Sequence, residues 1–157
     1  MTKHVTLEHI EAARRSHIKW LNRAISMTRG SSAIRDPHPL ASTACQFGIW
    51  FNNEGKNLYE KLGIDGFSKI HLLHDRLHEE YLNIYEIYFG SAEGVVYNQK
   101  AVLTKNTISK VQEEEAQAHM AKLRKLSYLM LEELTELQEE VKKSALFDIE
   151  AVPRILP

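Results

Sequence analysis

The chain has 157 residues, of which 43% are hydrophobic and 26% are charged, and its formal net charge is −1. This composition indicates one soluble globular domain with a real core and gives no reason to expect a nucleic-acid or anionic-membrane partner. A polar N-terminus, the absence of a long apolar run and a single cysteine predict a cytoplasmic protein without a signal peptide, a membrane span or an internal disulfide.

The seven glycines and four prolines gather in a few places and leave long uninterrupted stretches, so we predict an all-α fold. The first helix is expected over residues 6–28, with Thr6 as its N-cap. Apolar side chains recur at steps of three and four along it. This stripe consists of Ile10, Ala13, His17, Trp20, Ala24 and Met27. His17 therefore lies in the apolar seam, either as an ordinary buried histidine or as a ligand.

Residues 30–40 are rich in Gly, Ser and Pro and predict a loop. A second, shorter helix is expected to begin at residue 41 or 42 and to end at residue 53. Residues 54–66 contain three glycines and predict a turn, a short helical piece and another turn.

The inner face of the second helix is expected to carry Cys45, Gly48 and either Phe51 or Asn52. Gly48 lacks a side chain where another helix could approach closely. Trp50 is interpreted as a core residue. A lone cysteine such as Cys45 is more often a small buried apolar side chain than a metal ligand.

The clearest pattern predicts a helix over residues 67–89. Its seam consists of Phe67, Ile70, His74, Leu77, Tyr81, Ile84 and Tyr88, which is typical of a helical bundle. His74 and His78 are four positions apart and therefore project from the same face, where two imidazoles can hold one ion. His71 lies off the seam and is a weaker rival, because it pairs poorly with His78.

The last helix is predicted over residues 98–143, rich in Leu, Glu and Lys toward its end. Its apolar positions include Val102, Ile108, Val111, Ala118, Leu126, Met130, Leu134, Leu137 and Val141. The glutamates are expected on a solvated face: Glu113, Glu114, Glu115, Glu132, Glu133, Glu136, Glu139 and Glu140. His119 is expected to be exposed and without a partner.

These elements predict a four-helix-bundle-like domain of long antiparallel helices over residues 1–145. Residues 146–157 form a C-terminal tail, and residues 151–157, with two prolines, are expected to be frayed.

His17, Cys45, His74 and His78 form a tetrahedral ligand set of one thiolate and three imidazoles. Such donors favour Zn²⁺ over Mg²⁺ or Ca²⁺. Four protein ligands leave no position for substrate, so the ion would be structural or regulatory and the chain not an enzyme. A His-x-x-x-His pair by itself is common on helices and is weak evidence.

The motifs resemble the chemoreceptor zinc-binding (CZB) domain family. The resemblance rests on His17-Ile18-Lys19-Trp20-Leu21, Cys45-Gln46-Phe47-Gly48-Ile49-Trp50 and Leu73-His74-Asp75-Arg76-Leu77-His78. It covers residues 7–89 by motif and the following helix by architecture. It implies a bacterial helical bundle that binds zinc through three histidines and one cysteine, here His17, Cys45, His74 and His78.

The resemblance also implies a zinc- or redox-responsive switch that acts on a chemoreceptor or a diguanylate cyclase, with a homodimer as the expected assembly. The chain carries no cyclase motif and no long methyl-accepting hairpin, so it is interpreted as a standalone member or as a piece of a larger protein. Two alternatives stay open. One is a metal-dependent hydrolase with three histidine ligands and Cys45 as a bystander; the other is a metal-free dimerisation bundle.

Overall fold

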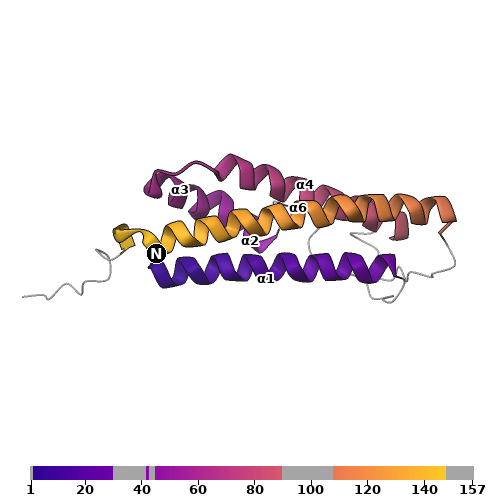
Figure 1. Cartoon of the computed structure of the whole chain (residues 1–157), viewed down its shortest axis with the longest axis horizontal. Coiled ribbons are helices and arrows are strands. Elements are labelled where there is room, and N and C mark those ends of the chain that lie inside the picture. Colours follow the sequence, from indigo (N-terminus) through magenta and orange to yellow (C-terminus); the bar gives the residue numbers. More distant parts are fainter. Residues whose placement is uncertain (1, 30–41, 43–44, 90–107, 148–157) are drawn as a thin grey trace, which may run out of the picture.

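The computed structural model describes residues 2–29, 42, 45–89 and 108–147. The elements of this part are all helical: α1 (Lys3–Thr28), α2 (Gln46–Trp50), the π-helix η1 (Phe51–Gly55), α3 (Lys56–Leu62), α4 (Phe67–Phe89), α6 (Lys110–Lys143) and the 3₁₀ helix η3 (Ala145–Phe147). Figure 1 shows three long helices, α1, α4 and α6, with the run from α2 to α3 as a shorter fourth member. The all-α, four-helix-bundle-like prediction is confirmed.

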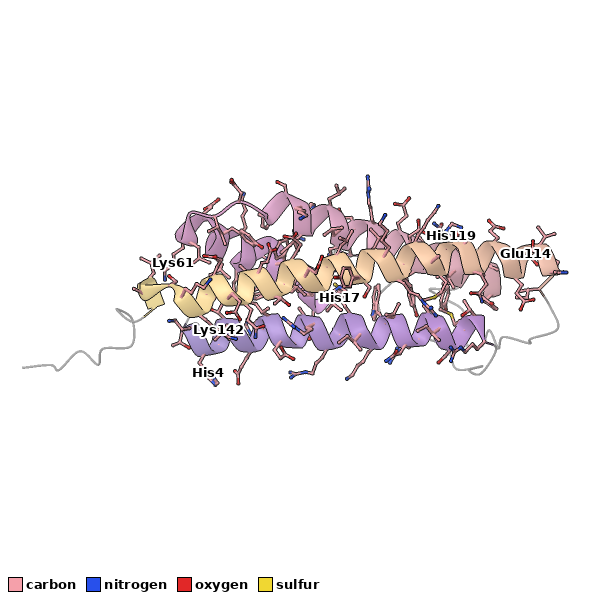
Figure 2. All side chains as sticks on the ribbon, in the orientation of Figure 1. His4, His17, Lys61, Glu114, His119 and Lys142 are labelled. Carbon is pink, nitrogen blue, oxygen red and sulfur yellow. The ribbon has the colours of Figure 1, made fainter. Side chains whose placement is uncertain are left out.

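One of the three long helices, α6, runs opposite to the other two (Figure 1). α6 runs antiparallel to both α1 and α4 and packs along each of them (Figure 1). At one end of the bundle the Lys3 Nζ donates to the Lys142 carbonyl oxygen at 3.2 Å. His4 and Lys142 lie at that end, and Glu114 and His119 lie toward the other (Figure 2). α6 therefore connects α1 to α4 over most of the length of the bundle.

The first helix begins one turn earlier than predicted. Thr2 is its N-cap, because the Thr2 side chain accepts a hydrogen bond from the Val5 amide at 3.3 Å. Thr6, the predicted cap, is buried inside the helix and donates its hydroxyl to the Thr2 carbonyl at 3.0 Å. The predicted stripe is confirmed: Ile10, Ala13, His17, Trp20, Ala24 and Met27 are all buried.

The second helical region differs more from the prediction. The helix begins at Gln46 rather than at residue 41 or 42, and it continues through η1 and α3 to Leu62 instead of ending at residue 53. Gly55 keeps helical backbone angles of φ −60° and ψ −42°, so it makes no turn. A Cβ at Gly55 would lie 2.8 Å from the fully buried Phe51 ring, so this glycine makes room for a core side chain. Asn52, the alternative inner residue, is exposed.

The helix over residues 67–89 has the predicted bounds. Its seam is confirmed, because Ile70, His74, Leu77, Tyr81, Ile84 and Tyr88 are buried and Phe67 packs against the core. α6 begins at Lys110, where Ser109 and Gln112 form a reciprocal capping box. The earlier predicted start at residue 98, and Val102 with it, lie outside the described residues, as do the predicted loop at 30–40 and the tail residues 148–157.

The predicted inner face of α6 was partly wrong. Val111 is 73% exposed and Ala118 is also exposed. The seam that faces α1 and α4 instead follows steps of three and four through Ala116, Met120, Leu123, Ser127, Met130, Leu134, Leu137 and Val141. The difference arises because Leu, Ala and Val occur on both faces of α6, and only packing between two neighbouring helices selects the buried set.

Two side chains predicted to be solvated instead link α4 to α6. His119 Nδ1 lies 2.6 Å from Glu80 Oε2, and both side chains are largely buried. Glu133 is 12% exposed and pairs with Lys69. A partner on another helix cannot be read from periodicity, which is why both were predicted to be free. Among the described residues, no helix is long and apolar enough to cross a membrane.

Candidate metal centre

Cys45 occupies the N-cap position of α2 rather than the helix itself. Its sulfur accepts a hydrogen bond from the Gly48 amide at 3.2 Å, and the thiol donates to the Ser42 carbonyl at 3.4 Å. Burial raises the pKa of the Cys45 thiol, and the backbone amide of Gly48 opposes that rise. The cap therefore fixes the direction in which the sulfur points, and the Gly48 N–H stabilises the thiolate form of Cys45.

Gly48 permits this arrangement because a side chain at its position would have no space. A Cβ there would lie 1.9 Å from the Ser42 carbonyl oxygen and 3.1 Å from His74 Cε1. The first contact is with backbone and cannot be relieved by a side-chain rotation. The sequence predicted that Gly48 allows another helix to approach closely, and His74 of α4 does lie against it. The tighter contact, however, is with Ser42, just before α2.

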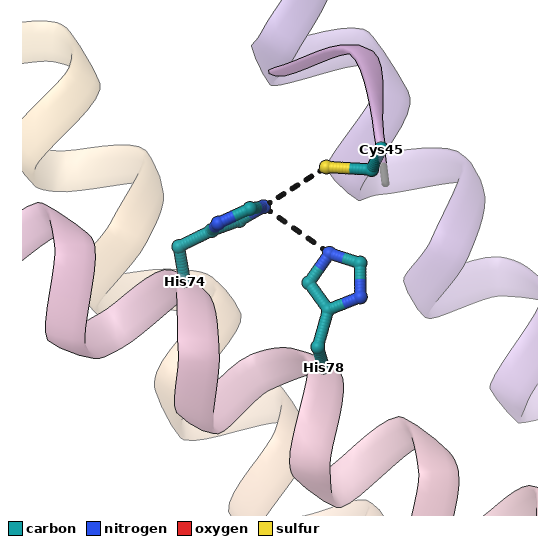
Figure 3. Close-up of side chains that lie close together, drawn as sticks. All are labelled: Cys45, His74 and His78. Atoms are coloured by element: carbon teal, nitrogen blue, oxygen red, sulfur yellow. Dashed lines mark hydrogen bonds between the residues drawn. The ribbon is translucent and has the colours of Figure 1, made fainter. Parts of the chain in front are cut away.

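His74 and His78 lie one turn apart on the buried face of α4, at 2% and 3% exposure. Their Nε2 atoms are 3.1 Å apart, and His74 Nε2 is 3.2 Å from Cys45 Sγ. Figure 3 shows the two rings and the sulfur pointing toward one another from α4 and from the start of α2. One ligand atom from each residue lies within 4.8 Å of the other two.

This donor set fits zinc by chemistry and by size. Zinc bonds of about 2.0–2.1 Å to nitrogen and about 2.3 Å to sulfur, at tetrahedral angles, place two nitrogens about 3.3 Å apart and nitrogen and sulfur about 3.6 Å apart. The observed separations of 3.1 and 3.2 Å fall within a few tenths of an ångström of these edges. A thiolate and two imidazoles are also softer donors than Mg²⁺ or Ca²⁺ prefer.

His17, the fourth predicted ligand, lies beside this group but is not one of its three members. It is 4% exposed in the α1 seam, and its ring meets the His74 ring edge-on with centroids 5.5 Å apart. Its Nδ1 lies 2.8 Å from the Ala13 carbonyl, so that nitrogen carries the proton and Nε2 keeps a lone pair. The structure brings three of the four predicted residues together and leaves His17 in the adjoining position.

The electrostatics of the site favour neutral imidazoles. Burial, with a smaller contribution from the neighbouring His17, His78 and His71, lowers the pKa of His74 to about 2. Burial also lowers the pKa of His17, against a smaller opposite effect of its hydrogen bond to Ala13. Neutral imidazoles present the lone pairs that a metal requires, and a divalent ion would compensate a Cys45 thiolate in this low-dielectric setting.

Three supporting residues, Ser42, Asp75 and Phe47, were given no role at the site by sequence reasoning. Asp75 accepts a hydrogen bond from the Ser42 hydroxyl at 2.5 Å and lies 3.5 Å from His71. Phe47 packs edge-on against the His17 and His74 rings at centroid distances of 5.4 and 5.0 Å. His71, the rival ligand, is not a member of the three-residue group. The available signals were the adjacency of Asp75 to His74 and the position of Phe47 two residues after Cys45.

Residues 17–85 match the family model described as the chemoreceptor zinc-binding domain. This segment belongs to the chemoreceptor zinc-binding domain family. The match begins at His17 and also contains Cys45, His74 and His78. Zinc is the metal of this family, and the chain has a Cys/His group positioned to hold an ion, so the predicted cofactor is confirmed at the level of the domain. Neither a curated protein nor a solved structure matches the chain.

Proposed function

We propose that this zinc-binding sensory domain holds one zinc ion through His17, Cys45, His74 and His78 and that the ion acts as a switch on a signalling partner. The observation that carries the proposal is the convergence of Cys45 Sγ with the Nε2 atoms of His74 and His78, all within 4.8 Å. Three ligands from two separated parts of the chain form a site only when α2 and α4 are held together.

His17 is the fourth ligand in this proposal. Two features support it: Nδ1 is engaged by the Ala13 carbonyl, which leaves Nε2 available, and the ring borders His74. With the His17 ring turned toward the other three ligands, the site would be tetrahedral with no open position, as in structural zinc sites. With His17 bound, the ion joins α1, α2 and α4.

Loss of zinc would remove that connection and leave the Nε2 atoms of His74 and His78 facing each other at 3.1 Å. One of the two must then be protonated, or the rings must separate, because two lone pairs repel. The position of α2 against α4 is therefore sensitive to the ion, and a partner that contacts this region could bind one of the two states preferentially.

The same site offers a redox route. A zinc-bound thiolate is the most oxidisable group of the chain, since Cys45 is its only cysteine. A hydroperoxide would transfer one oxygen atom to sulfur: the thiolate loses two electrons and becomes sulfenate, and the peroxide is reduced to water or an alcohol. The sulfenate is a poorer zinc ligand, so oxidation and zinc loss would give the same output.

The proposed partners are a chemoreceptor or a diguanylate cyclase, and the proposed assembly is a cytoplasmic homodimer. A two-fold dimer is the default symmetry for a bundle of this size. Light scattering across a concentration series tests the assembly. A monomer mass at every concentration would remove the dimer from the proposal without affecting the zinc site.

The ligand proposal is tested by zinc titration of His17→Ala, Cys45→Ala, His74→Ala and His78→Ala, each purified without a histidine tag, with His71→Ala as the matched control. We expect about one zinc per wild-type chain and a large loss of affinity in the four ligand variants alone. Circular dichroism should show the helices retained after chelation, because the apolar seams do not depend on the ion. Normal zinc binding by Cys45→Ala would remove the assignment.

The three-residue group also bears on the hydrolase alternative. That function requires three histidines and leaves Cys45 outside the site, whereas the described group contains Cys45 and not His17. X-ray absorption spectroscopy of the zinc-loaded chain distinguishes the two: the sensory site has one sulfur and three nitrogen neighbours. A metal-bound water together with sulfur-free coordination would favour the hydrolase.

A further inference from the structure

A hollow lies where α3 and the turn into α4 meet the C-terminal half of α6 (Figure 1). It has a volume of about 860 Å³ and is open to solvent. Residues of all three helices line it, among them Tyr59 of α3, Phe67 at the start of α4, and Glu133 and Glu136 of α6. We call it the α3–α6 pocket. The four proposed zinc ligands are not among its lining residues.

Tyr59 places a polar group in this pocket that the chain itself does not use. The side chain is 5% exposed, and its ring packs edge-on against Phe51 and Phe67. Its hydroxyl has no hydrogen-bond partner among the described residues and is not one of their enclosed unpaired atoms, so it opens into the pocket. A ligand there can reach this hydroxyl, which both donates and accepts hydrogen bonds.

The N-terminal end of α4 forms one wall of the pocket. The first hydrogen bond of this helix runs from the Ile70 amide to the Gly66 carbonyl at 3.0 Å, so the amides of residues 67–69 have no acceptor within the helix. Gly66 has no side chain that could accept from them. A Cβ added at Gly66 would lie 3.8 Å from the Tyr59 hydroxyl oxygen, so the hydroxyl stands beside these amides. Free amides and the positive end of the helix dipole favour a carboxylate.

The wall formed by α6 favours the opposite charge. Glu133 and Glu136 are three positions apart and therefore lie on one face of the helix. Burial, with a smaller contribution from these two charges, raises the pKa of Tyr59, so both carboxylates lie near its hydroxyl. Lys69 pairs with Glu133. The lining still has more acidic than basic side chains: Glu60, Asp65, Glu133 and Glu136 against Lys56 and Lys69.

We propose that the α3–α6 pocket binds a zwitterionic amino acid, with its carboxylate at the first turn of α4 and its ammonium group at Glu133 and Glu136. A ligand with one charge would meet a like charge, because a cation faces the positive end of α4 and an anion faces two carboxylates. A zwitterion separates its charges by a few ångström and meets neither. The Tyr59 hydroxyl donates to the ligand carboxylate.

The side chain of the ligand is restricted by the rest of the lining. Ile64 and Phe67 border the pocket with apolar atoms, so an apolar amino acid such as L-leucine suits the remaining space. This inference goes beyond the zinc switch and does not rest on it, since no lining residue is a proposed zinc ligand.

The test uses the zinc-loaded full chain labelled with ¹⁵N and three matched probes. L-leucine carries both charges, N-acetyl-L-leucine keeps only the carboxylate, and L-leucinamide keeps only the ammonium group. We expect L-leucine to shift the amide signals of residues 66–69 and to bind at least about tenfold more tightly than either derivative, because each derivative loses one charged contact.

Two variants test the assigned contacts. Tyr59→Phe and Glu136→Gln should each weaken the binding of L-leucine by about fivefold to tenfold, because each removes one polar contact and keeps the shape of the side chain. The matched control is Glu140→Gln, which removes a carboxylate of α6 outside the pocket and should bind L-leucine as the wild type does.

Each other outcome overturns the proposal. Equal binding of L-leucinamide would make the pocket a site for simple amines, and equal binding of N-acetyl-L-leucine would make it a site for anions. No shift of the signals of residues 66–69 with L-leucine at its solubility limit would show that the pocket takes no amino acid of this kind. Normal binding by both Tyr59→Phe and Glu136→Gln would place the ligand elsewhere.

Discussion

The proposed metal centre combines two regions of the chain whose local structure has different causes. α4 supplies His74 and His78 from an uninterrupted helix, one turn apart, and their positions follow from periodicity alone. The chain around Cys45 supplies its ligand from a helix cap, held by the Gly48 amide and packed against the Ser42 carbonyl. A regular helix tolerates change around its ligands, whereas a cap depends on backbone contacts that leave no space.

The largest effect is expected at Gly48. Gly48→Ala would place a Cβ 1.9 Å from the Ser42 carbonyl oxygen and force the cap apart. We expect zinc binding to be lost while the far-UV circular dichroism stays close to that of the wild type, because the long helices do not use this contact. The matched control is Ile49→Ala, a 52% exposed neighbour. Normal zinc affinity in Gly48→Ala would show that the cap is not needed.

The second prediction compares two histidines on α4. His78→Gln should weaken zinc by more than about 100-fold, because a ligand in the buried seam is lost and the effect should exceed that of a supporting residue. His71→Gln, which changes a half-exposed ring beside Asp75, should leave the affinity within a factor of a few. Competition titration with a zinc chelator measures both. Equal losses would mean that His71 belongs to the site.

Asp75 links the two regions, because it is on α4 and accepts a hydrogen bond from the hydroxyl of Ser42, which precedes Cys45. Asp75→Ala should loosen the chain before Cys45 and weaken zinc by about tenfold, or about 1.4 kcal/mol. Ser42→Ala should reproduce most of that loss, and the double variant should be no worse than either single one. Additive losses would indicate that the two residues act separately.

The histidines also predict how the chelated protein responds to acid. Burial lowers the pKa of His74 in the folded protein to about 2, from an ordinary value of 6.5. Between these values the unfolded state binds more protons, so stability is present above pH 6.5 and is lost as the pH falls. One such histidine gives a slope of up to about 1.4 kcal/mol per pH unit. Urea unfolding measured between pH 7 and pH 4 should show this fall in the free energy of unfolding, and His74→Gln should reduce its slope with pH.

The smallest effect concerns α6, which supplies no member of the metal group. Ser127 is 2% exposed in its seam, and its hydroxyl has no hydrogen-bond partner among the described residues. Ser127→Ala should raise the free energy of unfolding by about 1 kcal/mol, because a buried unpaired hydroxyl is removed. Zinc affinity should not change. A loss of stability would show that the hydroxyl is bonded, for instance to a buried water.

The sequence by itself determined the regular half of this protein. The stripes of α1 and α4, the four candidate ligands and the family motifs follow from spacing, because a helix turns a fixed angle per residue and side chains three or four positions apart share a face. Spacing did not predict three other features: the position of Cys45 as a cap, the continuation of the helix through Gly55, and the pairing of His119 with Glu80. Each depends on a contact with a distant part of the chain. Only the packed bundle decides such contacts, since the same local sequence permits several backbones and the neighbouring helix selects one.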